Sequence, residues 1–242
     1  MRLEEDTRYP HTPNYWHRFE NPPKMRGVLD RTKKGAPELN AINEWHVTEK
    51  IDGTNIRVML RNVHGTWQVD LFTREGTDSN IVWPGAKDYL RRTFTLENIF
   101  KAVDIAKLEE DTIVILYGEM FGPKIQGGGT YSSTVQYALF DVKIDDWWLE
   151  PERVRDFAVK LGIRYVPVIG MLTTHEVMKW FDLVMDNEQQ APNSYLSDKH
   201  IMEGIVCRAH PMMLFRNTRS PIQFKLKFKD MQQTLAWERE QA

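Results

Sequence analysis

The sequence is poor in cysteine and has no long apolar run. Cys207 is the only cysteine among 242 residues, which excludes an intrachain disulfide framework and a metal cluster held by several cysteines. No segment approaches the roughly 18–20 apolar residues of a membrane span, and the N-terminal MRLEEDTRYP is polar, unlike a secretory signal. The sequence therefore predicts a folded protein that neither crosses nor associates with a membrane.

The sequence also lacks a charge excess of either sign. Lys and Arg total 32 and Asp and Glu total 34, so any binding of nucleic acid would require a local basic patch. A hydrophobic content of 41% and a charged content of 27% are typical of a globular chain. The length predicts a single domain over residues 1–242.

Residues 1–45 are rich in proline, which predicts an irregular N-terminal arm. Between residues 24 and 34, five Lys or Arg residues accompany one acidic residue, Asp30. This basic cluster is either a solvated part of the arm or a contact for the substrate.

From residue 45 onward, β-rich and helical patterns are interspersed. Strands are expected at 45–51, 55–60, 67–73, 112–120, 135–142, 203–208, 212–215 and 221–228, with Asp-Gly and His-Gly turns at 52–53 and 64–65. Helices are expected at 96–108, at 151–161 with Gly162 as the stop, at 177–185 after a capping box of Thr173 and Glu176, and at 230–242 after a cap at Asp230. This order predicts an α+β fold with much antiparallel sheet, and not a doubly wound one.

Lys50 lies between a β-rich run and the Asp52-Gly53 turn, in the segment EKIDGTN. The end of a rigid element is a suitable place for a nucleophilic amine, which attacks phosphorus only in its neutral form. A surface lysine before a turn is the alternative interpretation.

The segment FKLKFK near the C-terminus alternates apolar and basic residues. A strand period of two places Phe224, Leu226 and Phe228 on one face and Lys225, Lys227 and Lys229 on the other. Such a face suits a phosphate, whereas the alternative is an edge strand protected by lysines against aggregation.

Two acidic residues adjoin glycines at the ends of apolar runs: Glu119 in YGEM and Glu203 in EGIV. Carboxylates at strand ends suit a ribose hydroxyl or hydrated Mg²⁺, although either is also a common turn residue. Arg74 could reach a phosphate or ribose or be a solvated strand-end charge, and Phe140 could stack on a base or belong to the core.

In this order, the segments resemble the motifs of the covalent nucleotidyltransferase superfamily, which contains ATP-dependent polynucleotide ligases and mRNA-capping guanylyltransferases. The similar segments are KIDG, YGEMFG, YALFDV, EGIVCR and FKLKFK, which span residues 49–229. KIDGTN, with Asn55, is most similar to the RNA ligase 2-like branch, whereas Asp52 is the choice of DNA ligases and capping enzymes. The resemblance implies an ATP-grasp-like ligase domain with antiparallel sheets flanked by helices.

The resemblance also implies a role for each site residue. Lys50 would attack the α-phosphate of ATP, and Lys225 and Lys227 would neutralise that phosphate. Asp52 and Glu203 would organise Mg²⁺ or Mn²⁺. The remaining residues would contact the nucleotide or the strand end: Glu49 near the base edge, Asn55 at the substrate end or metal shell, Arg74 near the ribose or substrate end, Glu119 on the ribose, and Phe140 stacked on adenine.

The implied activity is ATP-dependent RNA ligation of 5′-phosphate and 3′-hydroxyl ends, through lysyl-AMP and an adenylated 5′ end. The substrate would be nicked duplex RNA or an RNA/DNA hybrid. The alternatives are a small ATP-dependent DNA ligase, which Asp52 favours, a capping-type guanylyltransferase, and a non-catalytic nucleotide- or RNA-binding module.

Only 13 residues follow Lys229, which predicts a minimal or truncated enzyme without an oligonucleotide-binding barrel. Such an enzyme would grip its polynucleotide with the catalytic domain itself, and residues 198–230, with seven Lys or Arg against three Asp or Glu, could contribute. By family analogy, the expected protein is a monomer in the cytoplasm of a bacterium or a phage-infected cell.

Overall fold

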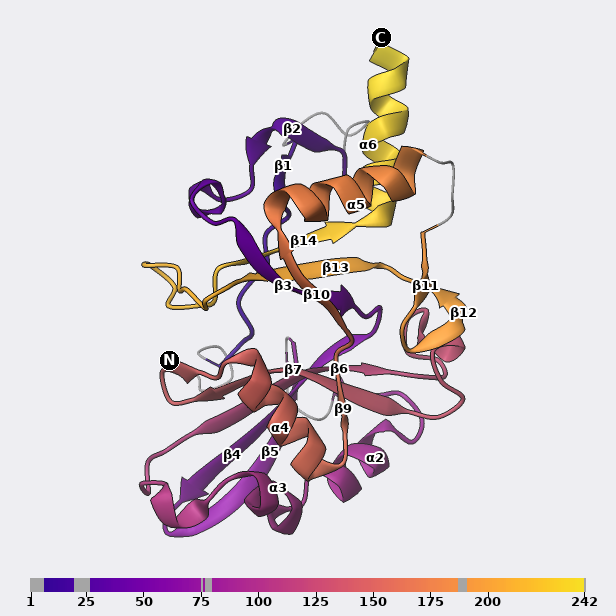
Figure 1. The fold of residues 1–242 in the computed structure, drawn as a ribbon. Coiled ribbons are helices and arrows are strands. Elements are labelled where there is room, and N and C mark those ends of the chain that lie inside the picture. Colours follow the sequence, from indigo (N-terminus) through magenta and orange to yellow (C-terminus); the bar gives the residue numbers. More distant parts are fainter. Residues whose placement is uncertain (1–6, 20–26, 75, 77–79, 187–190, 242) are drawn as a thin grey trace. The chain divides into compact units, whose positions relative to one another are not determined.

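The computed structural model describes residues 7–19, 27–74, 76, 80–186 and 191–241 (Figure 1). The chain forms two compact units, each discontinuous in sequence. Unit 1 comprises Met1–Tyr9 and Asp52–Val166, and unit 2 comprises Pro10–Ile51 and Pro167–Ala242. The chain therefore leaves unit 2 directly after Lys50-Ile51, within the predicted nucleophile segment.

Unit 1 is built on a largely antiparallel sheet whose strand order is β5-β4-β6-β7-β8, with β9 added parallel to β7. The strands are β4 (Thr54–Val63), β5 (Thr66–Thr73), β6 (Val114–Phe121), β7 (Gln136–Ile144), β8 (Trp147–Trp148) and β9 (Arg164–Tyr165). His64 and Gly65 both have positive φ, 52° and 81°, which matches the twist of the β4–β5 hairpin that they connect. The His-Gly turn is thus confirmed.

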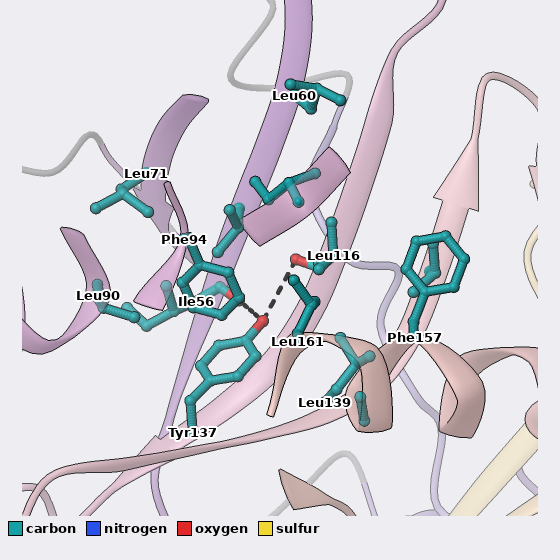
Figure 2. Packing of buried hydrophobic residues seen from close by; sticks show 14 of the residues in the cluster. Ile56, Leu60, Leu71, Leu90, Phe94, Leu116, Tyr137, Leu139, Phe157 and Leu161 are labelled. Atoms are coloured by element: carbon teal, nitrogen blue, oxygen red, sulfur yellow. Dashed lines mark hydrogen bonds between the residues drawn. The ribbon is translucent and has the colours of Figure 1, made fainter. Parts of the chain in front are cut away.

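Three helices supply apolar residues to the core on one face of this sheet: α2 (Ala86–Thr93), α3 (Leu96–Ala102) and α4 (Pro151–Leu161). Alternate residues of β4, including Ile56 and Leu60, join this core because successive strand side chains point to opposite faces. In Figure 2 the Tyr137 ring lies among these residues, with its hydroxyl 3.1 Å from the carbonyl oxygen of Ile56 and 3.4 Å from that of Leu116. The other face, here called the polar face, carries Asn55, Arg57, Tyr117 and Glu119.

Unit 2 contains a four-stranded antiparallel sheet in the order β10-β3-β13-β14. The strands are β3 (Glu44–Lys50), β10 (Val168–Thr173), β13 (Gly204–Ala209) and β14 (Gln223–Lys227). Two helices, α5 (Thr174–Asp186) and α6 (Phe228–Gln241), contribute to its core through the stacked rings of Phe181 and Phe228, 4.6 Å apart. Two small sheets pair β1 (Trp16–Arg18) with β2 (Leu29–Lys34), and β11 (Asn193–Ser194) with β12 (Ser197–Ile201).

Short 3-10 segments also occur, at η2 (Pro37–Asn40), η4 (Ile105–Lys107) and η5 (Gly128–Thr130). The last of these lies in the glycine-rich connection between β6 and β7. None of the helices in the described part of the chain is long and apolar enough to span a membrane.

Most predicted elements are confirmed. Strands β3, β4, β5, β6, β7, β13 and β14 occur at the predicted places, and α4 starts at Pro151 and ends before Gly162, which adopts φ 66°. The capping box is also confirmed, since the Thr173 N–H donates to Glu176 Oε2 at 2.7 Å and the Glu176 N–H donates to Thr173 Oγ1 at 3.2 Å. The α+β class with antiparallel sheets is therefore correct.

Several local predictions differ from the structure. Residues 212–215 form no strand, only an isolated bridge between Leu214 and Pro221, and the helix predicted over 96–108 ends at Ala102. The predicted arm, where it is described, contains β1, β2 and η2, because its Tyr15, Trp16 and Leu39 side chains belong to the unit 2 core. Met213 and Leu214 are exposed, so the apolar run at 212–215 does not mark a buried strand.

The junction between β14 and α6 also differs from the prediction. The helix begins at Phe228, so Lys229 leaves the predicted strand and Asp230 lies in the first helical turn. Asp230 forms an ion pair with Arg18 instead of capping the helix. The Phe228 ring stacks on the Phe181 ring of α5, and this packing accounts for the earlier start of the helix. The prediction missed it because a contact between residues far apart in the chain leaves no local sequence pattern.

Candidate active site

Lys50 is the last residue of β3, and the register of unit 2 places it in one row with two other predicted site segments. Gly204 of β13 lies opposite Lys50 on one side and opposite Lys227 of β14 on the other. Side chains of the same row point to the same face of a sheet. Gly204 has no side chain, so the two lysines flank an open position.

Glu203 connects these two lysines. The Lys50 Nζ lies 2.5 Å from Glu203 Oε2, and Lys227 pairs with the other carboxylate oxygen, Oε1. The three side chains are partly accessible, with exposed fractions of 24% for Lys50, 18% for Glu203 and 28% for Lys227. One carboxylate thus pairs with two ammonium groups, which leaves an excess of positive charge at a partly accessible surface.

Gly204 permits the close approach of β14. A Cβ atom at this position would lie 2.1 Å from the Leu226 carbonyl oxygen and 2.9 Å from the Lys227 Cα. Any larger residue would push away the strand that carries Lys225 and Lys227. The glycine of the EGIVCR segment therefore has a steric role next to the two lysines.

Lys225 lies on the same face, one row further along, beside Val206 and Thr48. The outer side of β14 is not free, because the Lys225 N–H donates to the Pro13 carbonyl at 2.9 Å and the Tyr15 N–H donates to the Lys225 carbonyl at 3.2 Å. Protection of an exposed strand edge therefore does not explain the lysines. Lys229 is exposed on α6 and does not belong to this face.

Glu49 lies on the opposite face of β3 from Lys50, and it is only 1% exposed. Its Oε2 accepts a hydrogen bond of 2.9 Å from the Tyr195 backbone N–H, and its Oε1 is buried with no partner in the described structure. Burial raises the pKa of Glu49, and hydrogen bonds from the Ser194 side chain and the Tyr195 backbone oppose this shift. The structure thus does not bring Glu49 to the lysine face.

Unit 1 brings together two other predicted residues at one end of its polar face. Asn55 of β4 and Glu119 of β6 are register partners. The Asn55 Oδ1 atom is buried and has no hydrogen-bond partner within the described ranges. Buried acceptors are normally hydrogen-bonded, so this oxygen is available to a donor group of a ligand.

Two further predicted residues of unit 1 lie near the ends of its strands. Asp52 is half-buried, and its backbone N–H donates to the Tyr131 hydroxyl at 3.0 Å. Arg74 is exposed directly after β5. In the described part of the chain, no three His, Cys, Asp or Glu side chains gather as a metal cluster.

Phe140 lies at a β-bulge in β7. Tyr117 pairs with Asp141 and Gly118 pairs with Leu139, so Phe140 is the extra residue. A bulge of this kind turns two successive side chains toward the same face. Phe140 is half-buried, and its ring centroid lies 4.9 Å from that of Tyr9.

The sequence prediction missed a group of buried polar residues beside Phe140. Arg57 and Asp141 are both fully buried, and Thr7 and Tyr9 contact them. The available signal was a charged residue inside an apolar strand pattern, in NIRVML and YALFDV. A buried charge requires partners, and those come from a segment distant in sequence.

With this geometry established, comparison with known proteins identifies the family. The RNA ligase family model matches residues 43–228. The chain belongs to the RNA ligase family. The matched range contains every predicted site residue from Glu49 to Lys227, and no curated protein matches the sequence.

Solved structures of a Naegleria gruberi RNA ligase share the fold of this family member. A variant with ATP and Mn aligns with a TM-score of 0.58 at 16% identity, covering 93% of this chain and 61% of that one. A second variant, with AMP and Mn, aligns with a TM-score of 0.56 at 16% identity over 91% of this chain and 58% of that one. An apo variant gives a TM-score of 0.56 at 15% identity, covering 95% and 59%. The chain thus spans about three fifths of the length of these ligases.

Proposed function

We propose that this chain is an ATP-dependent RNA ligase that joins 5′-phosphate and 3′-hydroxyl ends through a lysyl-AMP intermediate. The observation that carries the proposal is the row Lys50–Gly204–Lys227, with Glu203 paired to both lysines. Family membership over residues 43–228 supports the same activity. Units 1 and 2 would act together as one adenylyltransferase domain.

In the first step, Lys50 is the nucleophile. Its Nζ loses a proton and attacks the α-phosphorus of ATP, so that a nitrogen–phosphorus bond forms. The bond from that phosphorus to the bridging oxygen breaks, and pyrophosphate leaves with the electron pair. Lys225 and Lys227 would neutralise the charge that builds up on the phosphate oxygens, which is the main catalytic contribution in phosphoryl transfer.

In the second step, a 5′-phosphate oxygen of the RNA attacks the AMP phosphorus and releases Lys50. In the third step, the 3′-hydroxyl oxygen attacks the 5′-phosphate, loses its proton, and displaces AMP. Both steps are in-line displacements in which the protein mainly positions the reactants. Lys50 is thus regenerated in each cycle.

The residues present fit a nucleotide with a divalent cation. Asn55, whose buried Oδ1 has no partner among the described residues, and the adjacent Glu119 would contact the ribose or strand end. Phe140 would stack on adenine, and Arg74 would reach the ribose or substrate end. Glu49 would lie near the base edge, where its Oε1, which has no partner in the described ranges, can accept or donate a hydrogen bond according to its protonation state.

Asp52 and Glu203 would hold Mg²⁺ or Mn²⁺, which supplies charge neutralisation at the phosphates. Two carboxylates are sufficient because Mg²⁺ usually keeps several waters and binds substrate phosphates as well. In the structure both oxygens of Glu203 pair with lysines. Conversion of the Lys50 ammonium to a phosphoramidate, whose nitrogen carries no positive charge, would release one of these oxygens.

The proposed substrate is nicked duplex RNA or an RNA/DNA hybrid, bound by a monomer in the cytoplasm of a bacterial or phage-infected cell. The basic content of residues 198–230 supports direct contact with a polynucleotide.

The test is covalent labelling with ATP carrying a labelled α-phosphate in the presence of Mg²⁺ or Mn²⁺. Wild-type protein should become labelled and should release the label on addition of pyrophosphate, whereas Lys50→Ala should not become labelled. Lys199→Ala, which changes an exposed lysine of β12, is the matched control and should retain the label. Labelling that survives Lys50→Ala would overturn the assignment of the nucleophile.

The polynucleotide is then identified by sealing assays on nicked RNA, nicked DNA, RNA/DNA hybrids and single strands. Preferential sealing of nicks with RNA ends supports the proposal, and preferential sealing of nicked DNA favours the DNA ligase that Asp52 suggests. Labelling by GTP instead of ATP would indicate a capping-type enzyme. Absence of any adenylate would indicate a non-catalytic binding module.

A further inference from the structure

Two oppositely charged side chains are fully buried on the polar face of unit 1. Arg57 of β4 and Asp141 of β7 are both 0% exposed. Burial of a charge is unfavourable unless hydrogen bonds and opposite charges compensate it. The ligation chemistry described above uses neither residue, so their presence requires another explanation.

Residues 7–9, here called the strap, supply a hydrogen-bond partner to each of these two side chains. The Arg57 Nη1 donates to Thr7 Oγ1 at 2.8 Å, and its Nη2 donates to the Thr73 carbonyl at 3.0 Å. The Tyr9 hydroxyl donates to Asp141 Oδ2 at 2.6 Å, and the Tyr117 hydroxyl donates to the Thr7 carbonyl at 3.0 Å. The strap is thus bonded to strands β4, β6 and β7.

The Tyr9 ring is the centre of an aromatic cluster. Its centroid lies 5.0 Å from that of Tyr117, 4.9 Å from that of Phe140 and 5.9 Å from that of Trp148. The contact with Phe140 is edge-to-face, at an interplanar angle of 75°. Such pairs have a preferred geometry, so each ring restricts the orientation of the other.

The bulge in β7 explains how one tyrosine contacts two successive residues. Because the bulge turns Phe140 and Asp141 toward the same face, the Tyr9 ring reaches Phe140 while its hydroxyl reaches Asp141. The hydrogen bond holds the ring in place, and the ring in turn limits the tilt of the half-buried Phe140.

We propose that Tyr9 is a positioning residue for the nucleobase, which acts by fixing the orientation of Phe140. This inference rests on the proposed function, since it takes Phe140 as the ring that stacks on adenine. Stacking weakens when the supporting ring tilts, so loss of the Tyr9 ring should weaken nucleotide binding more than it slows the phosphoryl transfer. The strap therefore belongs to the nucleotide site although it lies 41 residues before Lys50 in sequence.

The test compares the ATP dependence of multiple-turnover nick sealing among variants of the full chain, because labelling of Lys50 alone occurs once per molecule and defines no kcat. Tyr9→Leu removes the ring and should raise the KM for ATP about three- to ten-fold, the range that an aromatic pair is worth, while kcat at saturating ATP stays within about two-fold. Tyr9→Phe keeps the ring but loses the bond to Asp141, so it should lower the unfolding temperature with a smaller change in KM. Trp147→Leu, an exposed aromatic of unit 1 outside the cluster, should leave KM unchanged.

Thr7→Val keeps the experiment decisive if Tyr9→Leu does not fold. It removes the bond to Arg57 without changing Tyr9, and it should raise the KM for ATP in the same direction. An unchanged KM in every folded strap variant, with kcat falling only in proportion to the folded fraction, would overturn the proposal and leave the strap a purely structural element. Failure of the wild-type protein to label would instead refute the proposed function itself.

Discussion

The lysines at positions 225, 227 and 229 alternate regularly in sequence, yet the structure gives them different surroundings. Lys227 pairs with Glu203, and Lys225 lies one row away on the same face of the sheet. Lys229 is exposed on α6 because the helix begins at Phe228. Substitution of each lysine in turn can therefore distinguish binding of a phosphate at one site from a general effect of positive charge.

We expect Lys225→Ala and Lys227→Ala each to reduce the rate of Lys50 adenylation by about ten-fold or more. Loss of a charge-assisted contact costs about 1.5–3 kcal/mol, and about 1.4 kcal/mol corresponds to ten-fold in rate. Lys229→Ala should behave as wild type. The measurement is single-turnover labelling with ATP, and equal losses in all three variants would contradict the assignment of the face.

The buried Glu49 predicts a dependence of stability on pH. Its pKa is raised above its ordinary value of 4.5, mainly by burial, so the native state holds a proton that the unfolded chain releases above that value. The contribution of Glu49 to the free energy of unfolding is thus fully present below about pH 4.5, and it is lost as pH rises through the pKa that Glu49 has in the folded state.

Glu49→Gln removes this titration and retains an oxygen for the Tyr195 N–H. The free energy of unfolding of wild type relative to Glu49→Gln should therefore decrease as pH rises from 5 to 8. Denaturant titrations of both proteins across that range measure the difference. A difference that increases with pH would show that the Glu49 carboxylate is stabilised as an anion.

At the scale of elements, glycines allow parts of the chain to approach closely. Gly118 lies in β6 within the YGEMFG segment, and a Cβ atom there would lie 2.2 Å from Cζ of the Tyr137 ring. The ring cannot easily retreat, because its hydroxyl lies within hydrogen-bond distance of the Ile56 and Leu116 carbonyls (Figure 2). The glycine of this motif therefore has a packing role beside Glu119.

Gly118→Ala should accordingly destabilise unit 1 by about 1–3 kcal/mol, the typical cost of overpacking a core. Gly129→Ala is a matched control in the same unit, since its nearest atom, the Pro123 Cα, would lie 3.8 Å away. Thermal or urea unfolding of the two variants measures the effect. Equal stability of Gly118→Ala and wild type would show that Tyr137 can move aside.

Element-level prediction from sequence succeeded where the signal was local. The limits of α4 follow from Pro151 and Gly162, and the start of α5 follows from the reciprocal bonds of Thr173 and Glu176. It was wrong for residues 212–215, where an apolar run forms only one isolated bridge. Pairing could not be predicted either: β3 and β4 are consecutive across the Asp52-Gly53 bend, yet they belong to different sheets.

At the scale of the whole molecule, the single cysteine is an internal reporter. Cys207 lies in β13 within the core of unit 2 and is fully buried, and burial raises its pKa well above the ordinary value. A thiol reagent requires an exposed thiolate, so modification requires opening of that core.

We expect a disulfide-exchange reagent to modify native protein about a hundred-fold more slowly, or slower still, than protein in denaturant. The absorbance of the released thiolate measures the rate, and Cys207→Ala provides the blank. Since no intrachain disulfide exists, a reducing agent should leave the unfolding temperature unchanged. Rapid modification in native buffer would contradict the described packing of β13.

The sequence by itself determined the family and the order of the motifs. Lys50, Glu203 and Lys227 could be selected because their neighbours in sequence, a turn, a glycine and an alternating strand, are short-range signals. The near cancellation of charge also restricted any nucleic-acid contact to local patches. The family model confirms the family, and the antiparallel sheets confirm the fold class.

Only the tertiary structure decided which residues face one another. The β13 register joins Lys50 to Lys227 across Gly204, and the bulge in β7 turns Phe140 and Asp141 toward Tyr9. The structure also shows that residues 7–9, in the segment predicted to be irregular, hydrogen-bond to the buried Arg57 and Asp141 side chains. Strand pairing and the compensation of buried charge depend on contacts between residues far apart in the chain, and no local pattern specifies them.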